Sequence, residues 1–157
     1  MAAAAAYAFP MDVLLQAYKY RGDLWLAPLL AETLAQEVRA DVDAIVPMPL
    51  APARLRERGF NQAQELARCL SGTLEVPLLT HACRKIIDTP AQATLAFSAR
   101  ARNVRGAFVC DADLRGMRIA IVDDVMTTGA SIDELARNVK RAGAAHVSGW
   151  VVARTLR

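Results

Sequence analysis

Apolar residues recur along the chain with two spacings, and each spacing predicts a different element. Apolar side chains three or four positions apart predict helices at about residues 26–39, after Asn61, and at about 131–141. Asn61 has the side chain of a helix N-cap, and Gly72 stands where that helix would end. A shorter helix is expected just after Pro10.

Short uninterrupted apolar runs predict buried strands, some with strong patterns and others with weak ones. The strong runs lie at residues 44–46, 119–122 and 147–153, and the weak ones at 76–79 and 82–87. Because strands alternate with helices, we expect an α/β domain with about five strands in a mostly parallel sheet flanked by helices. Residues 50–58 and 89–99 show no clear period and are predicted to be loops.

The composition excludes several broad classes of protein. The chain has 157 residues, 54% of them hydrophobic and 22% charged, which suits one globular domain and not a disordered chain. Its net charge of +3 is too small to indicate nucleic-acid binding by itself and fits a small anionic ligand equally well. The longest apolar stretch, at residues 24–31, is far shorter than the roughly 20 residues that span a membrane.

The N-terminus and the cysteines add two further expectations. The alanine run at residues 2–6 lacks the basic and apolar regions of a signal peptide and is interpreted as a low-complexity tail. The cysteines Cys69, Cys83 and Cys110 lie far apart in the sequence, and their odd number does not suggest a disulfide framework. We therefore expect structural thiols in a protein of the reducing cytoplasm.

One segment, residues 119–131 (IAIVDDVMTTGAS), carries most of the chemical information. A buried strand leads into two adjacent carboxylates, Asp123 and Asp124, at the edge where parallel sheets bind ligands. Small and hydroxyl residues then lead directly into a helix N-terminus, whose free N–H groups and positive dipole favour a phosphate. A ribose 5-phosphate needs both features: acceptors for its hydroxyls and, about one sugar away, donors for its phosphate.

Other interpretations of this segment are weaker. A single acid at a strand end is commonly a helix cap or a surface charge, but two acids followed by Thr-Thr-Gly-Ala-Ser are much less common. The chain has no P-loop and no Gly-x-Gly-x-x-Gly motif. Arg115 stands where a calcium loop around Asp111 and Asp113 needs an oxygen ligand. A phosphoacceptor receiver domain would place its paired acids near the start of the chain.

The segment 119–131 resembles the phosphoribosyl-pyrophosphate (PRPP) binding motif of type I phosphoribosyltransferases. From Tyr7 onward, the sequence resembles the ComF/GntX family of competence-associated, phosphoribosyltransferase-like proteins. The supporting segments are residues 18–22 (YKYRG), 45–50 (IVPMPL), 54–62 (RLRERGFNQ), 89–95 (TPAQATL) and 102–108 (RNVRGAF). The sequence departs from the family at two points. The Cys-rich, zinc-binding segment of many members is absent, and Ile87 stands where relatives often have a basic residue.

The resemblance implies a three-layer type I phosphoribosyltransferase fold in one domain, with a small helical hood at about residues 1–40 and a core at about 41–157. Asp123 and Asp124 would bind the ribose hydroxyls, directly or through Mg²⁺. The residues implied to hold the 5′-phosphate are Thr127, Thr128, Gly129, Ala130 and Ser131. Those implied to hold pyrophosphate are Met48, Pro49, Arg54 and Arg58. An open alternative is that the arginines at 54–58 form a solvated cluster near a helix start.

Further implied roles concern a loop and the hood. A loop that closes over the site would carry Arg84, Lys85, Thr89 and Gln92. Of these residues, Arg84 and Lys85 would act in catalysis. Lys19 is a candidate contact from the hood. The resemblance also predicts a strained cis peptide in the segment Pro-Met-Pro at residues 47–49.

The leading functional hypothesis is a transferase that moves ribose 5-phosphate from PRPP, with Mg²⁺, to an unidentified base or amine. A non-catalytic PRPP or nucleotide sensor is the second hypothesis, and Ile87 favours it. The third is an adaptor in competence-linked DNA uptake, because residues 54–58 and 100–105 are basic, although no aromatic residues are interleaved there. The apolar N-terminal helices leave a homodimer open, and no membrane partner is expected.

Overall fold

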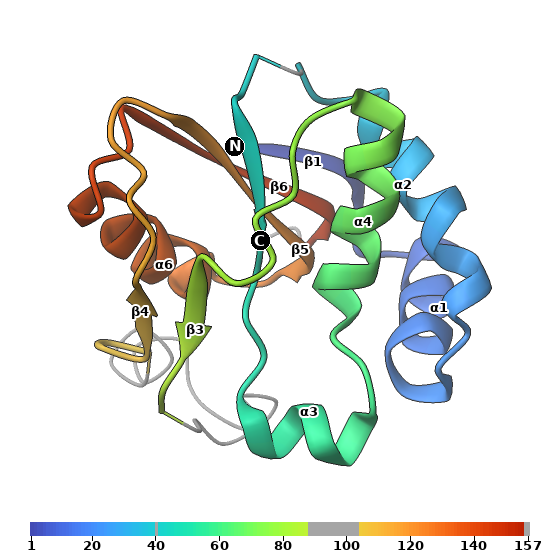
Figure 1. Ribbon diagram of the computed structural model, residues 1–157. Helices are drawn as coiled ribbons and strands as arrows, with labels where there is room; N and C mark the ends of the chain where they lie inside the picture. Colours follow the sequence, from blue (N-terminus) through green and yellow to red (C-terminus); the bar gives the residue numbers. More distant parts are fainter. Residues whose placement is uncertain (40, 88–103, 156–157) are drawn as a thin grey trace.

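The computed structural model describes residues 1–39, 41–87 and 104–155. Its centre is a four-stranded sheet in the order β1-β6-β5-β2, in which every neighbouring pair is parallel (Figure 1). The strands are β1 (Ala2–Ala6), β2 (Ala44–Pro47), β5 (Arg118–Met126) and β6 (His146–Arg154). The predicted parallel sheet is therefore confirmed. The weak strand predicted at 76–79 contributes one parallel bridge, from Leu78 to Ile45.

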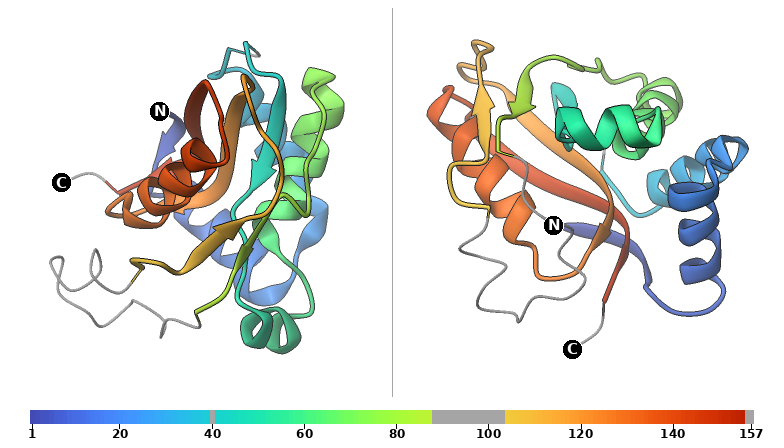
Figure 2. Two further views of the ribbon diagram at one scale, coloured as in Figure 1. Left: turned by 60° about the vertical axis from the view of Figure 1, so that its left-hand side comes forward. Right: turned by 90° about the horizontal axis from the view of Figure 1, so that it is seen from below.

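Helices cover both faces of this sheet and give the domain three layers (Figures 1 and 2). One face carries α1 (Met11–Gln16), its continuation as the wider helical turn η1 (Ala17–Arg21), the short turn η2 (Leu24–Leu26), α2 (Ala27–Ala35) and α4 (Gln62–Leu74). The other face carries α6 (Ala130–Arg141). Side chains of β5 alternate between these layers: Ala120 and Val122 pack in the core with α2 and α4, and Ile119 and Ile121 pack in the core with α6.

Two smaller elements lie at the edges of the domain. The strands β3 (Cys83–Lys85) and β4 (Phe108–Cys110) form an antiparallel pair, and β4 contacts α6. The helix α3 (Pro52–Arg58) follows β2 and lies beyond its carboxyl end (Figure 1). α3 is thus connected to the edge of the sheet at which ligands bind in parallel α/β folds.

The alanine run at the N-terminus is the edge strand β1, so its interpretation as a tail is wrong. It pairs with β6 from Ala2, opposite Trp150, to Ala6, opposite Arg154. The N–H of Tyr7 extends this pairing with a hydrogen bond of 2.8 Å to the carbonyl of Arg154. Strand pairing uses backbone N–H and C=O groups, which do not depend on the type of side chain. A run of identical alanines therefore has no alternation of apolar and polar residues that would predict a strand.

The predicted loop at 50–58 is also wrong, because it contains the helix α3. Pro52 occupies the first turn of this helix, and Gly59 ends it in the left-handed conformation with φ 82°. α3 buries none of its residues, and therefore no apolar stripe marks it in the sequence. The cis peptide predicted at 47–49 is likewise wrong. Among the described residues, the only cis bond joins Phe9 to Pro10.

Several element boundaries differ from the prediction. The helix expected to end at Gly72 continues as α4 to Leu74, and Glu75 caps it in the left-handed conformation. The strand predicted at 119–122 continues to Met126, because Val125 and Met126 still pair with β6. The helix predicted at 26–39 is helical as α2 only over Ala27–Ala35. The predicted loop at 89–99 lies outside the described residues. Within the part of the chain that is described, no helix is long and apolar enough to cross a membrane.

Candidate functional site

The paired acids lie near the carboxyl end of β5 and face different neighbours. Asp124 is 2% exposed and contacts Lys19 of η1, in the layer of the N-terminal helices. Asp123 lines a small cavity of about 40 Å³ at the start of α6. The alternation of side chains along β5 therefore puts the two carboxylates in different electrostatic environments.

Lys19 supplies the positive charge at the acidic pair. Its Nζ lies 3.2 Å from Oδ2 of Asp124, and the lysine side chain is 27% exposed. Burial disfavours the charged form of Lys19, but the carboxylates of Asp124 and Asp123 outweigh it and raise the pKa of Lys19. Burial likewise acts to raise the pKa of Asp124, and the charge of Lys19 overcomes this effect, so that the pKa of Asp124 is lowered. Asp124 is therefore the more acidic member of the pair.

Asp123 has the opposite behaviour. Its Oδ1 accepts a hydrogen bond of 2.9 Å from the backbone N–H of Asp124. Burial and the neighbouring charge of Asp124 raise the pKa of Asp123 well above its ordinary value. Carboxyl groups with strongly shifted pKa values cluster at functional sites, so the divergent pair makes this strand end a candidate site.

The predicted phosphate-binding segment follows directly from this strand. Gly129 adopts φ 82° at the N-cap of α6, and the N–H of Ala130 donates to Oγ1 of Thr128 at 3.3 Å. Residues 125–132 line the same cavity as Asp123. The structure thus brings one carboxylate and the start of a helix to a common hollow, where backbone N–H groups and the helix dipole suit an anion.

The segment predicted to hold pyrophosphate lies beside the acidic pair. β2 neighbours β5 in the sheet, and the N–H of Met48 donates to the carbonyl of Val122 at 2.8 Å. Asn61, the N-cap of α4, accepts a hydrogen bond from the N–H of Ala63 and donates Nδ2 to the carbonyl of Met48 at 3.1 Å. Met48 and the Pro49 that follows it are therefore held between the end of β5 and the start of α4.

The segments 18–22 and 54–62, which both support the family resemblance, contact each other. The buried hydroxyl of Tyr18 donates to the carbonyl of Gln62 at 2.7 Å. Arg58 donates to the side chain of Gln62, and its guanidinium lies 5.9 Å from the centre of the Tyr20 ring. These contacts fix η1 against α4 and so place Lys19 at Asp124. The predicted cap role of Asn61 is confirmed. The sequence reasoning missed its contact with Met48 and the positioning roles of Tyr18 and Gln62, which only their three-dimensional contacts reveal.

The other predicted basic residues have partners away from the acidic pair. Arg54 on α3 pairs with Glu57 at 3.0 Å. Arg84 on β3 pairs with Asp111 at 2.8 Å, and Lys85 lies 5.7 Å from the centre of the Phe108 ring. Their predicted roles toward a ligand stay predictions, and the predicted loop residues Thr89 and Gln92 lie outside the described part of the chain.

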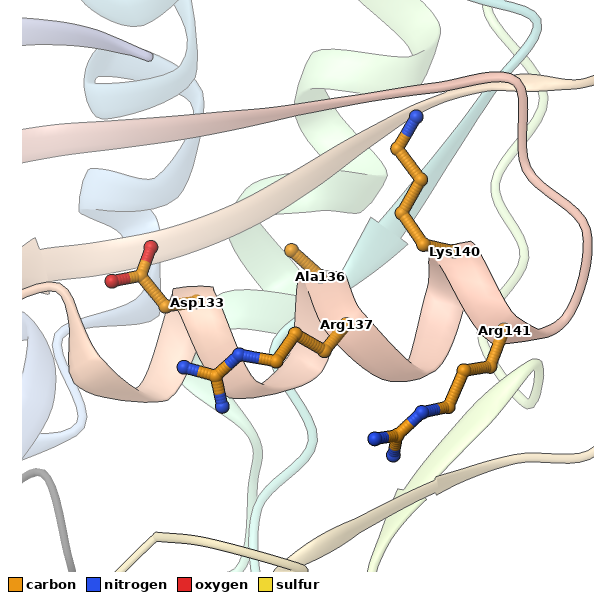
Figure 3. Close-up of a pocket in the computed structure, with 5 residues that line it drawn as sticks. All are labelled: Asp133, Ala136, Arg137, Lys140 and Arg141. Atoms are coloured by element: carbon orange, nitrogen blue, oxygen red, sulfur yellow. The ribbon is translucent and has the colours of Figure 1, made fainter.

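The broad hollow on the outer face of α6, with a volume of about 460 Å³, is not the candidate site. Figure 3 shows the side chains that line it, all on this one helix. Two of the basic groups there have structural partners: Arg137 pairs with the buried Glu134, and Lys140 donates to the carbonyl of Ala145 at 2.6 Å. The apolar side of α6, with Ile132 and Leu135, faces the sheet, so this hollow lies on the side of the helix that faces solvent.

The residues present fit Mg²⁺ only together with a phosphate ligand. Within the described residues, no three His, Cys, Asp or Glu side chains lie close enough to hold a metal ion by themselves. Asp123 and Asp124 offer carboxylate oxygens, and Mg²⁺ is commonly held by one or two carboxylates together with water and substrate phosphates. These two residues would therefore hold the ion.

Comparisons with known proteins identify relatives of the chain and structures of the same fold. No protein-family model matches the chain. The chain is 31% identical to competence protein F of Haemophilus influenzae over 159 residues, 94% of this chain and 69% of that protein. It is 35% identical to the DNA utilization protein YhgH of Escherichia coli over 160 residues, 97% of this chain and 70% of that protein. It is 30% identical to competence protein ComFC of Bacillus subtilis, of which it covers 60%.

Two solved structures, both of enzymes, share the fold of this chain. Glutamine PRPP amidotransferase from Bacillus subtilis superposes with a TM-score of 0.59 and 17% identity, over 86% of this chain and 30% of that one. A structure described as the allosteric regulatory enzyme of purine biosynthesis superposes with a TM-score of 0.55 and 18% identity, over 87% of this chain and 30% of that one. The type I phosphoribosyltransferase fold is thus shown, and the sequence relatives assign the chain to the ComF family, to which competence protein F, YhgH and ComFC belong.

Proposed function

We propose that this protein binds PRPP with Mg²⁺ at the carboxyl ends of β5 and β2 and transfers its ribose 5-phosphate to a base or amine, releasing pyrophosphate. The observation that carries the proposal is the cavity shared by Asp123 and the start of α6. A carboxylate acceptor and a phosphate-binding helix terminus lie next to each other there, as a ribose 5-phosphate requires. The adjoining Met48 segment supports a place for the pyrophosphate group.

The charges of the site suit this reaction. When pyrophosphate leaves the anomeric carbon, positive charge develops on the ribose and negative charge on the leaving group. Asp123 and Asp124 would hold the ribose hydroxyls and stabilise the positive charge, and Arg54 and Arg58 of α3 would stabilise the negative charge. Mg²⁺, when bound, neutralises phosphate oxygens. The acceptor is the nucleophile, so no side chain has to form a covalent intermediate.

Calorimetric titration of PRPP into the protein, with and without Mg²⁺, tests this proposal. Mg²⁺-assisted binding is expected for the natural sequence and is expected to disappear in the variant Asp123→Asn/Asp124→Asn. Asp113→Asn is the matched control, because Asp113 is an exposed acid that pairs with Arg115 and is not part of the site. A folded natural protein that does not bind PRPP under either condition would contradict the proposal.

The same sample separates the transferase from a non-catalytic sensor. Release of pyrophosphate is measured after PRPP is bound, with a panel of free bases and amines as acceptors. Release with at least one acceptor supports the transferase. Tight PRPP binding without release for any acceptor would instead favour a PRPP-binding regulator.

The names of the relatives support a second candidate function, a role in DNA uptake or use. Arg54, Arg56 and Arg58 on α3 would supply basic groups for a nucleic-acid backbone. The test is a titration with single-stranded DNA at low and high salt, using Arg54→Ala/Arg56→Ala as the variant. Salt-dependent binding that this variant weakens supports the role, and no binding at low salt removes it.

A further inference from the structure

Two of the cysteines face each other across the small antiparallel sheet. Cys83 of β3 is the register partner of Cys110 of β4. The backbone hydrogen bonds of this sheet join Ile86 to Ala107 at 2.8 Å and Asp111 to Ala82 at 3.1 Å. Hydrogen-bonded and non-hydrogen-bonded pairs alternate along an antiparallel sheet, so the pair Cys83 and Cys110 occupies a non-hydrogen-bonded position.

This position has the backbone spacing that a disulfide needs. Cα atoms of non-hydrogen-bonded pairs lie about 4.5 Å apart, and their side chains approach more closely than those of hydrogen-bonded pairs. Disulfides bridge Cα atoms about 4.4–6.8 Å apart. The strands of this sheet therefore need no large movement to bring the two sulfur atoms within bonding distance.

The surroundings of the two thiols set the order in which they would react. Cys83 is buried, and Cys110 is partly exposed on the rim of the core beside α6. Burial raises the pKa of Cys83, and direct interaction with the Cys110 thiol raises it further, which disfavours the Cys83 thiolate and leaves Cys110 as the thiol that reacts first. Both thiols are free, and the third cysteine, Cys69, lies on α4 in the other layer of the domain.

We propose that Cys83 and Cys110 are a site of reversible oxidation that forms a cross-strand disulfide by exchange with a low-molecular-weight disulfide such as oxidised glutathione. The partly exposed Cys110, as its thiolate, attacks one glutathione sulfur and releases the other glutathione as a thiolate. The Cys83 thiolate then attacks the Cys110 sulfur and releases the second glutathione. The protons of the two cysteine thiols pass to the two glutathiones, so the protein loses two electrons and oxidised glutathione gains them.

The disulfide would act on a part of the protein that carries predicted functional residues. Arg84 and Lys85 follow Cys83 directly on β3, and Arg84 pairs with Asp111, the residue after Cys110. A covalent bond between β3 and β4 would hold these basic side chains in their present register. The oxidation site itself depends only on the sheet geometry and is independent of the proposed transferase activity.

The experiment incubates the natural protein with oxidised glutathione and then measures free thiols in denaturant, the intact mass and the disulfide-linked peptides. The expected result is the loss of two of the three thiols, a mass lower by two hydrogen atoms and a peptide that links Cys83 to Cys110. Reduced glutathione in excess is expected to restore all thiols. Three free thiols after incubation, or stable glutathione adducts without an internal bond, would overturn the proposal.

Two variants control this result. Cys69→Ser keeps both members of the pair and is expected to form the same linked peptide. Cys110→Ser, which changes the more exposed thiol and is checked for folding by circular dichroism, is expected to form no internal disulfide. A disulfide that persists in Cys110→Ser, or one that requires Cys69, would show that the pairing proposed from the sheet is wrong.

Discussion

Replacing Asp123 with Asn is expected to stabilise the metal-free protein, whereas replacing Asp124 with Asn is expected to destabilise it. Both variants remove one carboxylate from the same strand end, and they are isosteric. They differ in what they leave behind. Asp123→Asn removes the acid whose pKa is raised by burial and by the charge of Asp124. Asp124→Asn removes the acid that lies 3.2 Å from Lys19.

The magnitudes follow from these environments. Each unit by which folding raises a carboxyl pKa destabilises the folded state by about 1.4 kcal/mol at high pH. We therefore expect Asp123→Asn to raise the free energy of unfolding at pH 7.5, by on the order of the 1 kcal/mol typical of a single substitution. Removing one partner of a fully buried ion pair costs about 3–5 kcal/mol, but Lys19 is partly exposed and also interacts with the charge of Asp123. The expected loss for Asp124→Asn is accordingly about 1–2 kcal/mol.

The pH dependence of the two variants has opposite signs. Because the folded protein binds a proton at Asp123 more tightly than the unfolded chain does, the natural sequence loses stability as pH rises from the unfolded pKa through the folded pKa. The gain in the free energy of unfolding from Asp123→Asn should therefore be small near pH 4 and largest at neutral pH. Folding lowers the pKa of Asp124. Its contribution to stability is therefore complete above the pKa that it has in the unfolded chain, and it disappears as pH falls through the pKa that it has in the folded protein.

The assay is urea denaturation at pH 4 and pH 7.5, in the presence of a chelator, followed by circular dichroism. A double-mutant cycle with Lys19→Met isolates the coupling between Lys19 and each acid, and the larger coupling is expected for Asp124. Equal destabilisation by the two Asn variants at pH 7.5 would refute the asymmetric charge distribution argued for the pair.

Further substitutions test the contacts that position the site. Tyr18→Phe removes the hydrogen bond to Gln62 and should lower the free energy of unfolding by about 1 kcal/mol in urea denaturation. Asn61→Ala should cost about 1–2 kcal/mol and weaken PRPP binding in calorimetry, and Asn61→Asp, which keeps the cap but not the donor to Met48, should recover mainly the stability. Gly129→Ala, at φ 82°, should cost about 1–2 kcal/mol in thermal or urea unfolding, whereas Gly72→Ala inside α4 should gain about 0.5–1 kcal/mol. A stabilised Gly129→Ala would contradict the left-handed conformation at the start of α6.

The parallel sheet and the acidic segment could be predicted from the sequence because their signals are local. An uninterrupted apolar run marks β5 and a helical period marks α6, and the Asp-Asp pair and Gly129 lie between them. In a parallel α/β fold the carboxyl end of a strand and the start of the next helix are necessarily neighbours. The order of these residues along the chain therefore already places the acidic pair next to a helix N-terminus of the kind that favours a phosphate.

Features that depend on distant partners were decided only by the tertiary structure. The alanine run becomes a strand because β6 leaves an unpaired edge, and α3 escapes detection because it buries no side chain. Lys19 reaches Asp124, more than a hundred residues later, because Tyr18 fixes η1 to α4. Cys83 and Cys110 become partners through the register of β3 and β4. Charge compensation and thiol pairing act over a few ångströms in space, and a linear pattern of hydrophobic and polar residues does not encode which distant residues come that close.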